Sequence, residues 1–251
     1  MVQTISITSP VKFYSQNYIT PLCTFSGDCE NQGALYDNRP EQTAEFVKFD
    51  ASAPVMWRVE FADKYGVPCT RLVNTVIVQN TTAQSVEILQ ISPDELVGFP
   101  LISLGHFELQ KNNIFTVAPC EAKGLVFRFY CREESFTVGE IRALTFLFDL
   151  KATTHTKLVP NTDGGSYTAQ DGRFYSWTNY HNPGLEIEVE NGHYDQYQTL
   201  RSRVAANENI TVIPFKELDW WVLEGVLDRE ISPSVNRFSG LLNYTIKVVS
   251  I

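Results

Sequence analysis

Basic residues are scarce in this chain. It has 20 Lys and Arg against 29 Asp and Glu, a formal net charge of -9 at pH 7. This balance argues against a surface that binds nucleic acid by neutralising its phosphates, although a lumen through which DNA slides without adhering would tolerate it. The five cysteines form no C-x-x-C pair, so we expect neither a disulfide framework nor a zinc site.

Long apolar stretches are also missing. No stretch approaches the ~20 apolar residues that a membrane-spanning helix needs. The first ten residues, MVQTISITSP, contain neither a basic start nor a continuous apolar stretch. We therefore expect a protein that is made in the cytoplasm, is not exported by a signal peptide and has no membrane span.

The usual local signatures of catalysis are absent. The sequence has no G-x-S-x-G, no G-x-x-x-x-G-K and no G-x-G-x-x-G, and its four histidines form no H-E-x-x-H pair. These motifs carry nucleophiles, phosphate-binding loops and metal ligands. We expect no enzyme and no cofactor, and assign no catalytic, cofactor-binding or metal-binding residue.

Alternation of apolar and polar residues dominates the first half. Trp57, Val59 and Phe61 alternate with Arg58 and Glu60, as in a half-buried strand. Residues 72–78, 85–88, 125–131 and 141–150 are further strand candidates. No helix longer than two turns is expected before residue 150. Many short strands separated by Gly, Pro, Asn and Asp favour an antiparallel sandwich or jelly roll.

The composition changes after residue 150. Residues 151–183 are rich in Thr, Asn, Gly, Asp and Tyr, with turn signals at 163–165 and 171–172. Because structureless connections of that length are uncommon, we consider a hairpin within 167–177. Strands at 185–190, 210–215, 220–227 and 241–251, with a helix at 194–206, predict an α+β unit.

The predicted fold is therefore mainly β, in two domains. Residues 1–153 form an N-terminal β-sandwich (jelly roll). Residues 154–251 form a small α+β domain with one helix packed on an antiparallel sheet.

Two polar clusters each have a functional and a structural interpretation. Glu186, Glu188 and Glu190 could suggest paired carboxylates or a cation site, but period-two charge is what a solvated strand face produces. The loop 35–43 offers oxygen atoms for a ligand or calcium from Asp37, Asn38 and Thr43. A plain turn is favoured, because a calcium site needs six to eight oxygens and few carboxylates are nearby.

Aromatic residues supply the interface candidates. Trp220 and Trp221 invite a sugar-stacking hypothesis, but adjacent strand residues point to opposite faces, so we favour one in the core and one at an interface. We predict an interface formed by Trp177, Tyr180, Trp220 and Trp221. A carbohydrate-binding alternative depends on exposed aromatic residues such as Tyr65, Trp177 and Tyr180.

The first half resembles the galactose-binding-like (discoidin or coagulation-factor type) jelly rolls. The segment Leu35-Tyr36-Asp37-Asn38-Arg39-Pro40 through Thr43 matches the L-x-D-x-x-x-x-T opening of that family. The amphipathic stretch 57–61 and a strand ending at Asn80 follow in the family's order, and 125–131 with 138–141 look like its closing strands. The resemblance covers roughly residues 20–150. The Trp that often follows the Thr is absent, with Phe46 nearby instead.

The second half looks like small tail proteins of bacteriophages, over 165–177, 194–206, 212–215 and 238–245. Together the two halves are similar to phage tail-tip, distal-tail or baseplate components, in which the α+β part joins a ring and the sandwich projects from it. This resemblance implies a non-enzymatic virion structural protein of the tail. Its partners would be further copies of itself in a ring or tube and neighbouring tail or baseplate proteins, with no sequence-specific nucleic acid. The alternative is a carbohydrate-binding host-adhesion protein with a glycan partner.

Overall fold

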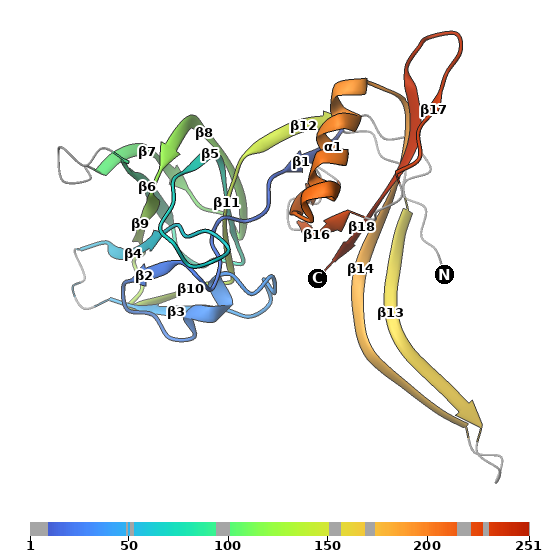
Figure 1. The fold of residues 1–251 in the computed structure, drawn as a ribbon. Coiled ribbons are helices and arrows are strands. Elements are labelled where there is room, and N and C mark those ends of the chain that lie inside the picture. Colours follow the sequence, from blue (N-terminus) through green and yellow to red (C-terminus); the bar gives the residue numbers. More distant parts are fainter. Residues whose placement is uncertain are drawn as a thin grey trace. The chain divides into compact units, whose positions relative to one another are not determined.

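The structure is a computed structural model that describes residues 10–48, 50, 53–93, 101–150, 157–168, 174–214, 222–227 and 231–250. The chain divides into two compact units. The sandwich unit comprises Asn17–Phe146, and the discontinuous unit combines Met1–Gln16 with Leu147–Ile251. The described residues form mainly β-strands with one α-helix (Figure 1), which confirms the predicted fold class.

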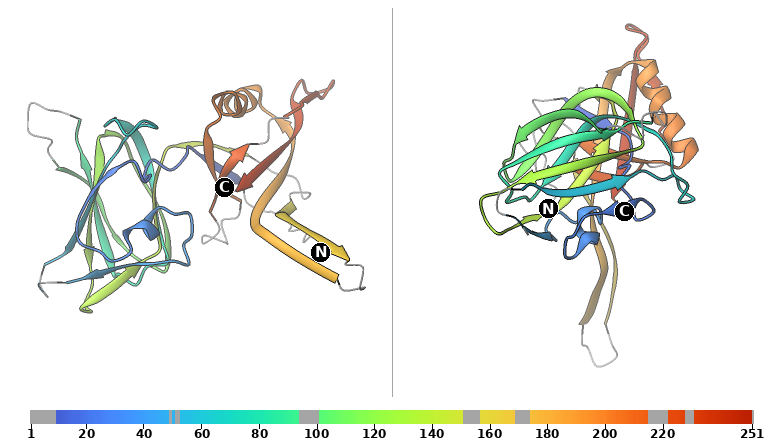
Figure 2. Two further views of the ribbon diagram at one scale, coloured as in Figure 1. Left: turned by 60° about the horizontal axis from the view of Figure 1, so that its bottom comes forward. Right: turned by 90° about the vertical axis from the view of Figure 1, so that its left-hand side faces the viewer.

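The sandwich unit is built from antiparallel sheets (Figures 1 and 2). A five-stranded sheet has the order β2 (Thr24–Ser26), β4 (Val55–Glu60), β9 (Gly124–Tyr130), β6 (Ser85–Ile91) and β7 (Leu101–Glu108). A three-stranded sheet has the order β11 (Glu140–Leu144), β5 (Arg71–Gln79) and β8 (Asn112–Ala122), and β10 (Ser135–Val138) pairs with β3 (Ala44–Val47). A short 3-10 helix, η1 (Gln32–Leu35), lies between β2 and β3.

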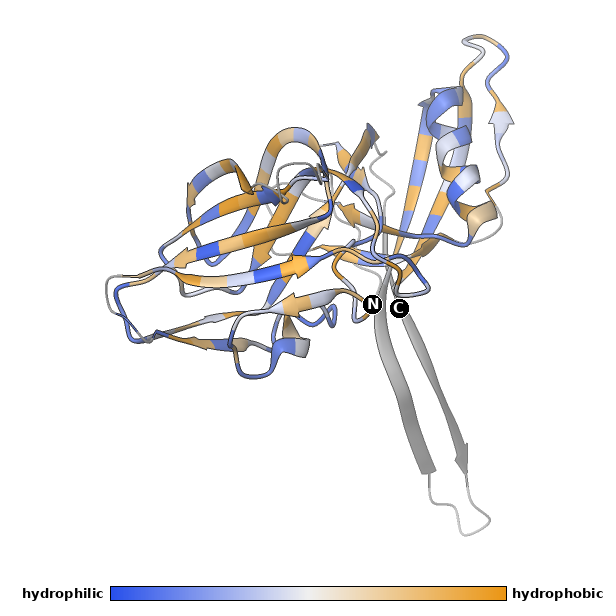
Figure 3. Ribbon diagram, turned by 60° about the vertical axis from the view of Figure 1, so that its left-hand side comes forward, coloured by the Kyte–Doolittle hydropathy of each residue, from blue (hydrophilic) through white to orange (hydrophobic). Residues whose placement is uncertain are grey.

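The core of this unit follows from the period-two pattern of its strands. Trp57 and Val59 of β4 are fully buried, and they pair with Phe127 and Leu125 of β9, which are also buried. The rings of Trp57 and Phe127 lie 5.6 Å apart. Figure 3 shows the resulting alternation of apolar and polar residues along the strands. The strands predicted at 57–61, 72–78, 85–88 and 125–131 are confirmed.

The single strand predicted at 141–150 is wrong, because the structure divides it in two. β11 ends at Leu144 and pairs with β5, whereas β12 (Phe146–Leu150) pairs with β1 (Val11–Tyr14) in another sheet. Between them, the Thr145 hydroxyl donates to the carbonyl of Leu72, and the Phe146 amide donates to Asn74 Oδ1 at 2.7 Å. These bonds satisfy the backbone where the chain leaves the sandwich unit.

The discontinuous unit is organised around one sheet with the order β12, β1, β15 (Asn209–Ile213), β16 (Leu223–Leu227), β18 (Leu242–Ser250), β14 (Phe174–Gly192) and β13 (Lys157–Thr168). β17 (Ser234–Val235) pairs with β18 off this path. Because Phe13 pairs with Val212, residues 1–16 group with the second half of the chain. The division therefore differs from the predicted boundary at residue 153, and the sandwich unit is an insertion.

The predicted helix at 194–206 is confirmed as α1 (Tyr194–Ala206). Its residues Tyr197 and Leu200 are buried in the same apolar cluster as Ile187 and Tyr244. The helix begins with a capping box between His193 and Gln196 and ends at Asn207 in the left-handed conformation. Within the described residues no helix is long and apolar enough to span a bilayer.

A two-stranded arm extends from the sheet of the discontinuous unit. β14 pairs with β18 over Gly184–Gly192, while its earlier residues pair, within the described part of the chain, with β13 alone. Residues 160–168 and 174–183 therefore form a hairpin that continues past the end of β18 (Figure 1). The hairpin considered within 167–177 is present and is longer than predicted. We call these two segments the arm.

Candidate functional site

The structure describes two of the four predicted interface residues. Trp177 and Tyr180 both lie in the arm, where Trp177 pairs with Gly165 and Tyr180 pairs with Asp163. Trp220 and Trp221 lie outside the described residues. The structure therefore brings two of the four predicted residues onto one element.

The loop 35–43 is a structural turn whose polar atoms bond within the protein. Asp37 Oδ1 accepts the backbone amide of Arg39 at 2.9 Å, and Asn38 Oδ1 accepts Arg142 Nη2 at 2.6 Å. The Asn80 side chain, just after β5, donates to the carbonyl of Pro40 at 2.9 Å. These bonds fix the loop against β5 and β11, which agrees with the plain-turn interpretation.

No metal site emerges in the described part of the chain. Groups of three or more His, Cys, Asp or Glu side chains placed to hold a metal ion are absent from those residues. Glu186 and Glu188 are half-buried between the buried positions of β14, and Glu186 lies 3.9 Å from Lys247 Nζ. This arrangement is the partly solvated strand face that the alternation predicts.

Three of the five cysteines have surroundings that disfavour the thiolate. All five are free. Burial, together with the charge of Asp28, raises the pKa of the Cys29 thiol to about 11. Burial also raises the pKa values of Cys69 and Cys120. At neutral pH these three thiols are protonated and therefore poor nucleophiles.

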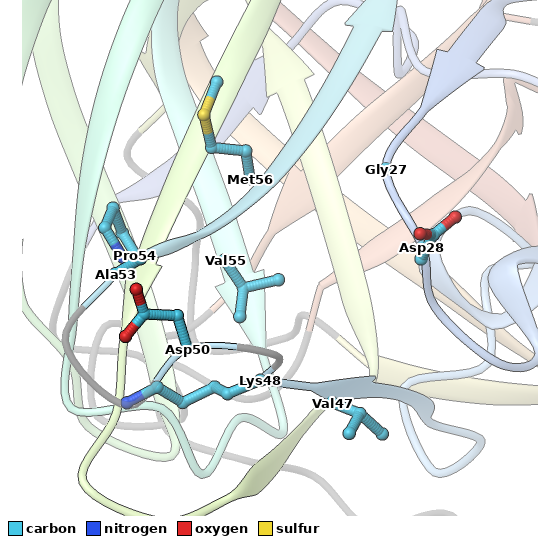
Figure 4. A pocket seen from close by; sticks show the side chains of 9 residues that line it. All are labelled: Gly27, Asp28, Val47, Lys48, Asp50, Ala53, Pro54, Val55 and Met56. Atoms are coloured by element: carbon cyan, nitrogen blue, oxygen red, sulfur yellow. The ribbon is translucent and has the colours of Figure 1, made fainter.

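The sandwich unit has an exposed hollow where β3 ends and β4 begins. It has a volume of about 280 Å³ and is shown in Figure 4. Its lining residues come from the segment after β2, the end of β3 and the start of β4: Gly27, Asp28, Val47, Lys48, Asp50, Ala53, Pro54, Val55 and Met56. A second hollow of about 400 Å³ shares Gly27, Asp28 and Val47 and adds Cys29, Glu30, Gln32 and Glu45. We call the two together the β3–β4 groove.

Strand geometry explains the apolar part of the β3–β4 groove. Phe46 and Trp57 point into the core, so their neighbours Val47 and Met56 point outward and are 45% and 46% exposed. Gly27 has a φ of +121°, and a Cβ there would lie 2.5 Å from the carbonyl oxygen of Met56. Only glycine lets the segment after β2 pass this close to β4.

The polar part of the β3–β4 groove is acidic. Asp28, Glu30, Glu45 and Asp50 are exposed, and Glu30 and Glu45 exchange backbone hydrogen bonds of 2.8 and 3.1 Å. Lys48 is the one cation among the lining residues that the structure describes, and its ammonium donates to the carbonyl of Cys131 at 2.7 Å. The groove thus offers hydrogen-bond acceptors beside an apolar strip and opposes anionic ligands.

Tyr65 does not belong to this groove. It is 77% exposed in a turn held by Asp63 Oδ1, which accepts the backbone amides of Tyr65 and Val67 at 2.8 and 3.0 Å. These bonds lower the pKa of Asp63. The turn follows the end of β4, whereas the groove lies at its start, so the two features lie at opposite ends of that strand.

The sequence alone did not identify the groove residues. One signal was present, because Met56 is an apolar residue at an outward position between Val55 and Trp57. An apolar residue at such a position marks exposed apolar surface. The approach of residues 27–30 to this strand gave no local signal.

Comparisons with known proteins identify fold likenesses only. No family model matches the chain, and no curated protein sequence matches it. Among solved structures, the family 32 CBM (carbohydrate-binding module) of C. perfringens NanJ, in complex with galactose, has 13% identity and a TM-score of 0.40, covering 52% of this chain and 98% of that chain.

Two further modules are similar. The CBM32 of AlyQ, in complex with 4,5-unsaturated mannuronic acid, has 10% identity and a TM-score of 0.38, over 51% of this chain and 96% of that chain. Chitosan-binding module 1 from the chitosanase/glucanase of Paenibacillus sp. IK-5 has 15% identity and a TM-score of 0.39, and the match covers 52% of this chain and 98% of that chain. At these values the likenesses assign no family, ligand or activity, and nothing in them indicates a phage tail or baseplate. The chain's own strand pairing defines a β-sandwich unit inserted into an α+β unit.

Proposed function

We propose that the chain is a non-enzymatic carbohydrate-binding adhesion protein that binds glycan in the β3–β4 groove. The observation that carries this proposal is the strip formed by Val47 and Met56, half-exposed and bordered by carboxylates, in a hollow of about 280 Å³.

The chemistry of the groove matches that of a pyranose. A sugar ring has an apolar C–H face and a rim of hydroxyl donors. Val47 and Met56 offer apolar surface to the C–H face, and the Asp28 carboxylate accepts hydrogen bonds from the hydroxyl groups. The volumes of about 280 and 400 Å³ lie near the lower end of the range for small-ligand sites. Two adjoining hollows suit two residues of an oligosaccharide.

The charge of the groove sets the class of sugar. Among its described lining residues the exposed carboxylates outnumber the lysine, so sialic and uronic acids are repelled, whereas neutral sugars and amino sugars are accepted. Because the hollow is exposed and none of its described lining residues is aromatic, we expect a weak site with a Kd of about 1 mM, or ~4 kcal/mol.

The test is a glycan array followed by titration calorimetry with the full chain. We expect binding to neutral or amino-sugar glycans. Asp28→Asn should weaken it about tenfold, since a hydrogen bond to a charged group contributes ~1.5–3 kcal/mol. Met56→Ala should weaken it to a similar degree, because it removes apolar contact surface. Tyr65→Ala is the matched control, because that exposed residue lies at the other end of β4. An array without signal above background, or groove variants that bind like the unmodified chain, would refute the proposal.

A second candidate function is that of a virion structural protein in a phage tail, made in the host cytoplasm. The arm favours it, because a hairpin that continues past its sheet suits assembly with neighbouring subunits or with tail and baseplate proteins. Imaging of particles that carry a labelled copy of the chain tests this candidate. Label on the tail supports it, and unlabelled particles exclude it.

A further inference from the structure

We infer that the turn between β17 and β18, residues 236–241, is a second saccharide site, which takes a pyranose that carries a carboxylate. Its aromatic platform is Phe238 and its cation is Arg237, and both side chains are exposed. The turn belongs to the discontinuous unit, whereas the β3–β4 groove belongs to the sandwich unit. The inference goes beyond the proposed function and does not depend on it, because this site takes the acidic sugars that the groove repels.

The β17–β18 turn has a defined conformation. The Asn236 amide donates to the carbonyl of Leu241, and the Gly240 amide donates to the carbonyl of Asn236, each at 2.8 Å. Asn236 Oδ1 accepts the Phe238 amide at 3.0 Å. Gly240 has a φ of +71°, which favours glycine. Figure 1 shows the turn at the outer end of the hairpin that β17 and β18 form.

Side-chain bonds tie this turn to the end of β14. Asn191 Oδ1 accepts Asn236 Nδ2 at 3.1 Å and Ser239 Oγ at 3.2 Å. The backbone amide of Asn191 donates to Asn243 Oδ1 at 2.9 Å. A site that is already ordered loses little conformational freedom when a ligand binds, so these bonds favour binding at the turn.

Phe238 offers an uncovered aromatic face. Its side chain is fully exposed, although burial of an apolar ring is favourable in water. The face of an aromatic ring is electron-rich and attracts the weakly positive C–H groups of a second molecule. One face of a pyranose consists of such C–H groups, so a sugar ring can stack on Phe238.

The surroundings of Phe238 favour a saccharide over a protein partner. Its exposed neighbours Arg237, Ser239 and Asn191 are polar, and Val235, 64% exposed, is the apolar residue beside the turn. A protein hot spot is usually surrounded by a packed interface of ~800 Å² per partner. Sugar hydroxyls instead need hydrogen-bond donors and acceptors around the ring, and guanidinium, hydroxyl and amide groups provide them.

The charge of the β17–β18 turn selects an acidic sugar. The charged residues of the segment 231–250 are Arg237 and Lys247, both basic. A guanidinium binds a carboxylate through two parallel hydrogen bonds, which an ammonium cannot reproduce. Glu190 is exposed next to Asn191 and opposes an acid, so we expect a weak site, with a Kd of about 5 mM. Uronic and sialic acids share the required chemistry, a pyranose ring with a carboxylate.

The test is an NMR titration of the full chain labelled with nitrogen-15. The acidic probes are methyl β-glucuronide and sialyllactose, and the neutral probe is methyl β-glucoside with an equal concentration of sodium acetate. We expect the amides of Phe238, Ser239 and Gly240 to shift with the acids, with at least about fivefold tighter binding than for the glucoside. A response to one acid alone supports the inference and identifies the uronic or the sialic acid as the ligand.

Variants separate the roles of the two side chains. Phe238→Ala should weaken binding of the acids at least about fivefold. Arg237→Gln should remove the difference between glucuronide and glucoside, and Arg237→Lys should restore part of it. Tyr65→Ala is the control and should change binding less than about twofold, because that exposed ring already has Lys64 Nζ 5.2 Å from its centroid.

The inference is overturned if the acids leave the amides of the β17–β18 turn unshifted, or if Phe238→Ala binds them like the unmodified chain. The exposed ring would then be an anchor for a protein. Binding of neutral glycans in the β3–β4 groove should be the same in the Phe238 and Arg237 variants. The two proposals therefore fail separately.

Discussion

Replacing Arg142 by Met is expected to destabilise the sandwich unit strongly. Arg142 is 1% exposed in β11. Its guanidinium donates to Gln79 Oε1 and, at 2.6 Å, to Asn38 Oδ1, and it lies 3.7 Å from the carboxylate of Glu140, which is equally buried. Removing one partner of a buried ion pair leaves an uncompensated charge and costs ~3–5 kcal/mol. The loss also frees the loop 35–43 from β11.

Urea unfolding followed by circular dichroism measures this cost, with the sandwich transition identified by hydrogen exchange of the β4 and β9 amides. The double variant Arg142→Met with Glu140→Gln should regain at least about 1.5 kcal/mol of the loss, because the buried negative charge is then removed as well. A single variant that costs less than about 1 kcal/mol would refute this reasoning, as would a double variant in which the two losses simply add.

Further predictions concern both units. Burial raises the pKa values of Tyr14 and Tyr244 to about 12. The folded state therefore holds these protons more tightly, and stability should fall between pH 10 and pH 12 by up to ~2 kcal/mol per tyrosine, measured as urea midpoints. Tyr244→Phe removes a buried hydroxyl that has no hydrogen-bond partner among the described residues, and should raise the free energy of unfolding by ~1 kcal/mol in thermal denaturation. A lower melting temperature would contradict this. Gly124→Ala places a Cβ against the β4 backbone and should cost ~2–3 kcal/mol in urea unfolding. Phe238→Ser should change stability by less than ~0.5 kcal/mol, since that ring is fully exposed, and should reduce binding of an apolar dye.

Local periodicity predicted the strands and the helix that bury one of their faces. The strand with Trp57 and Val59 and the helix with Tyr197 and Leu200 follow directly from spacings of two and of three to four residues. The missed elements depend on distant partners. β1 is four residues long and is defined by pairing with β15, and the break at Thr145 depends on bonds to β5.

The candidate sites were harder to predict from the sequence for the same reason. The β3–β4 groove joins segments near residues 28, 47 and 56 that only the folded backbone brings together. Trp177 and Tyr180 were selected from the sequence as aromatic residues in a polar stretch. That both lie in one hairpin follows from the pairing of β13 with β14.

The insertion of the sandwich unit between β1 and β12 has a consequence for synthesis of the chain. β1 is synthesised before the sandwich unit, but Tyr14 pairs with Thr211, so this strand waits for β15, which is synthesised after that unit. The sandwich unit is contiguous and can fold in the meantime. Because β1 and β12 are neighbours in their sheet, a shorter linker joining them would leave the surrounding fold a route to form without its insert. The position between β1 and β12 is thus one at which another domain can be inserted in place of the sandwich unit.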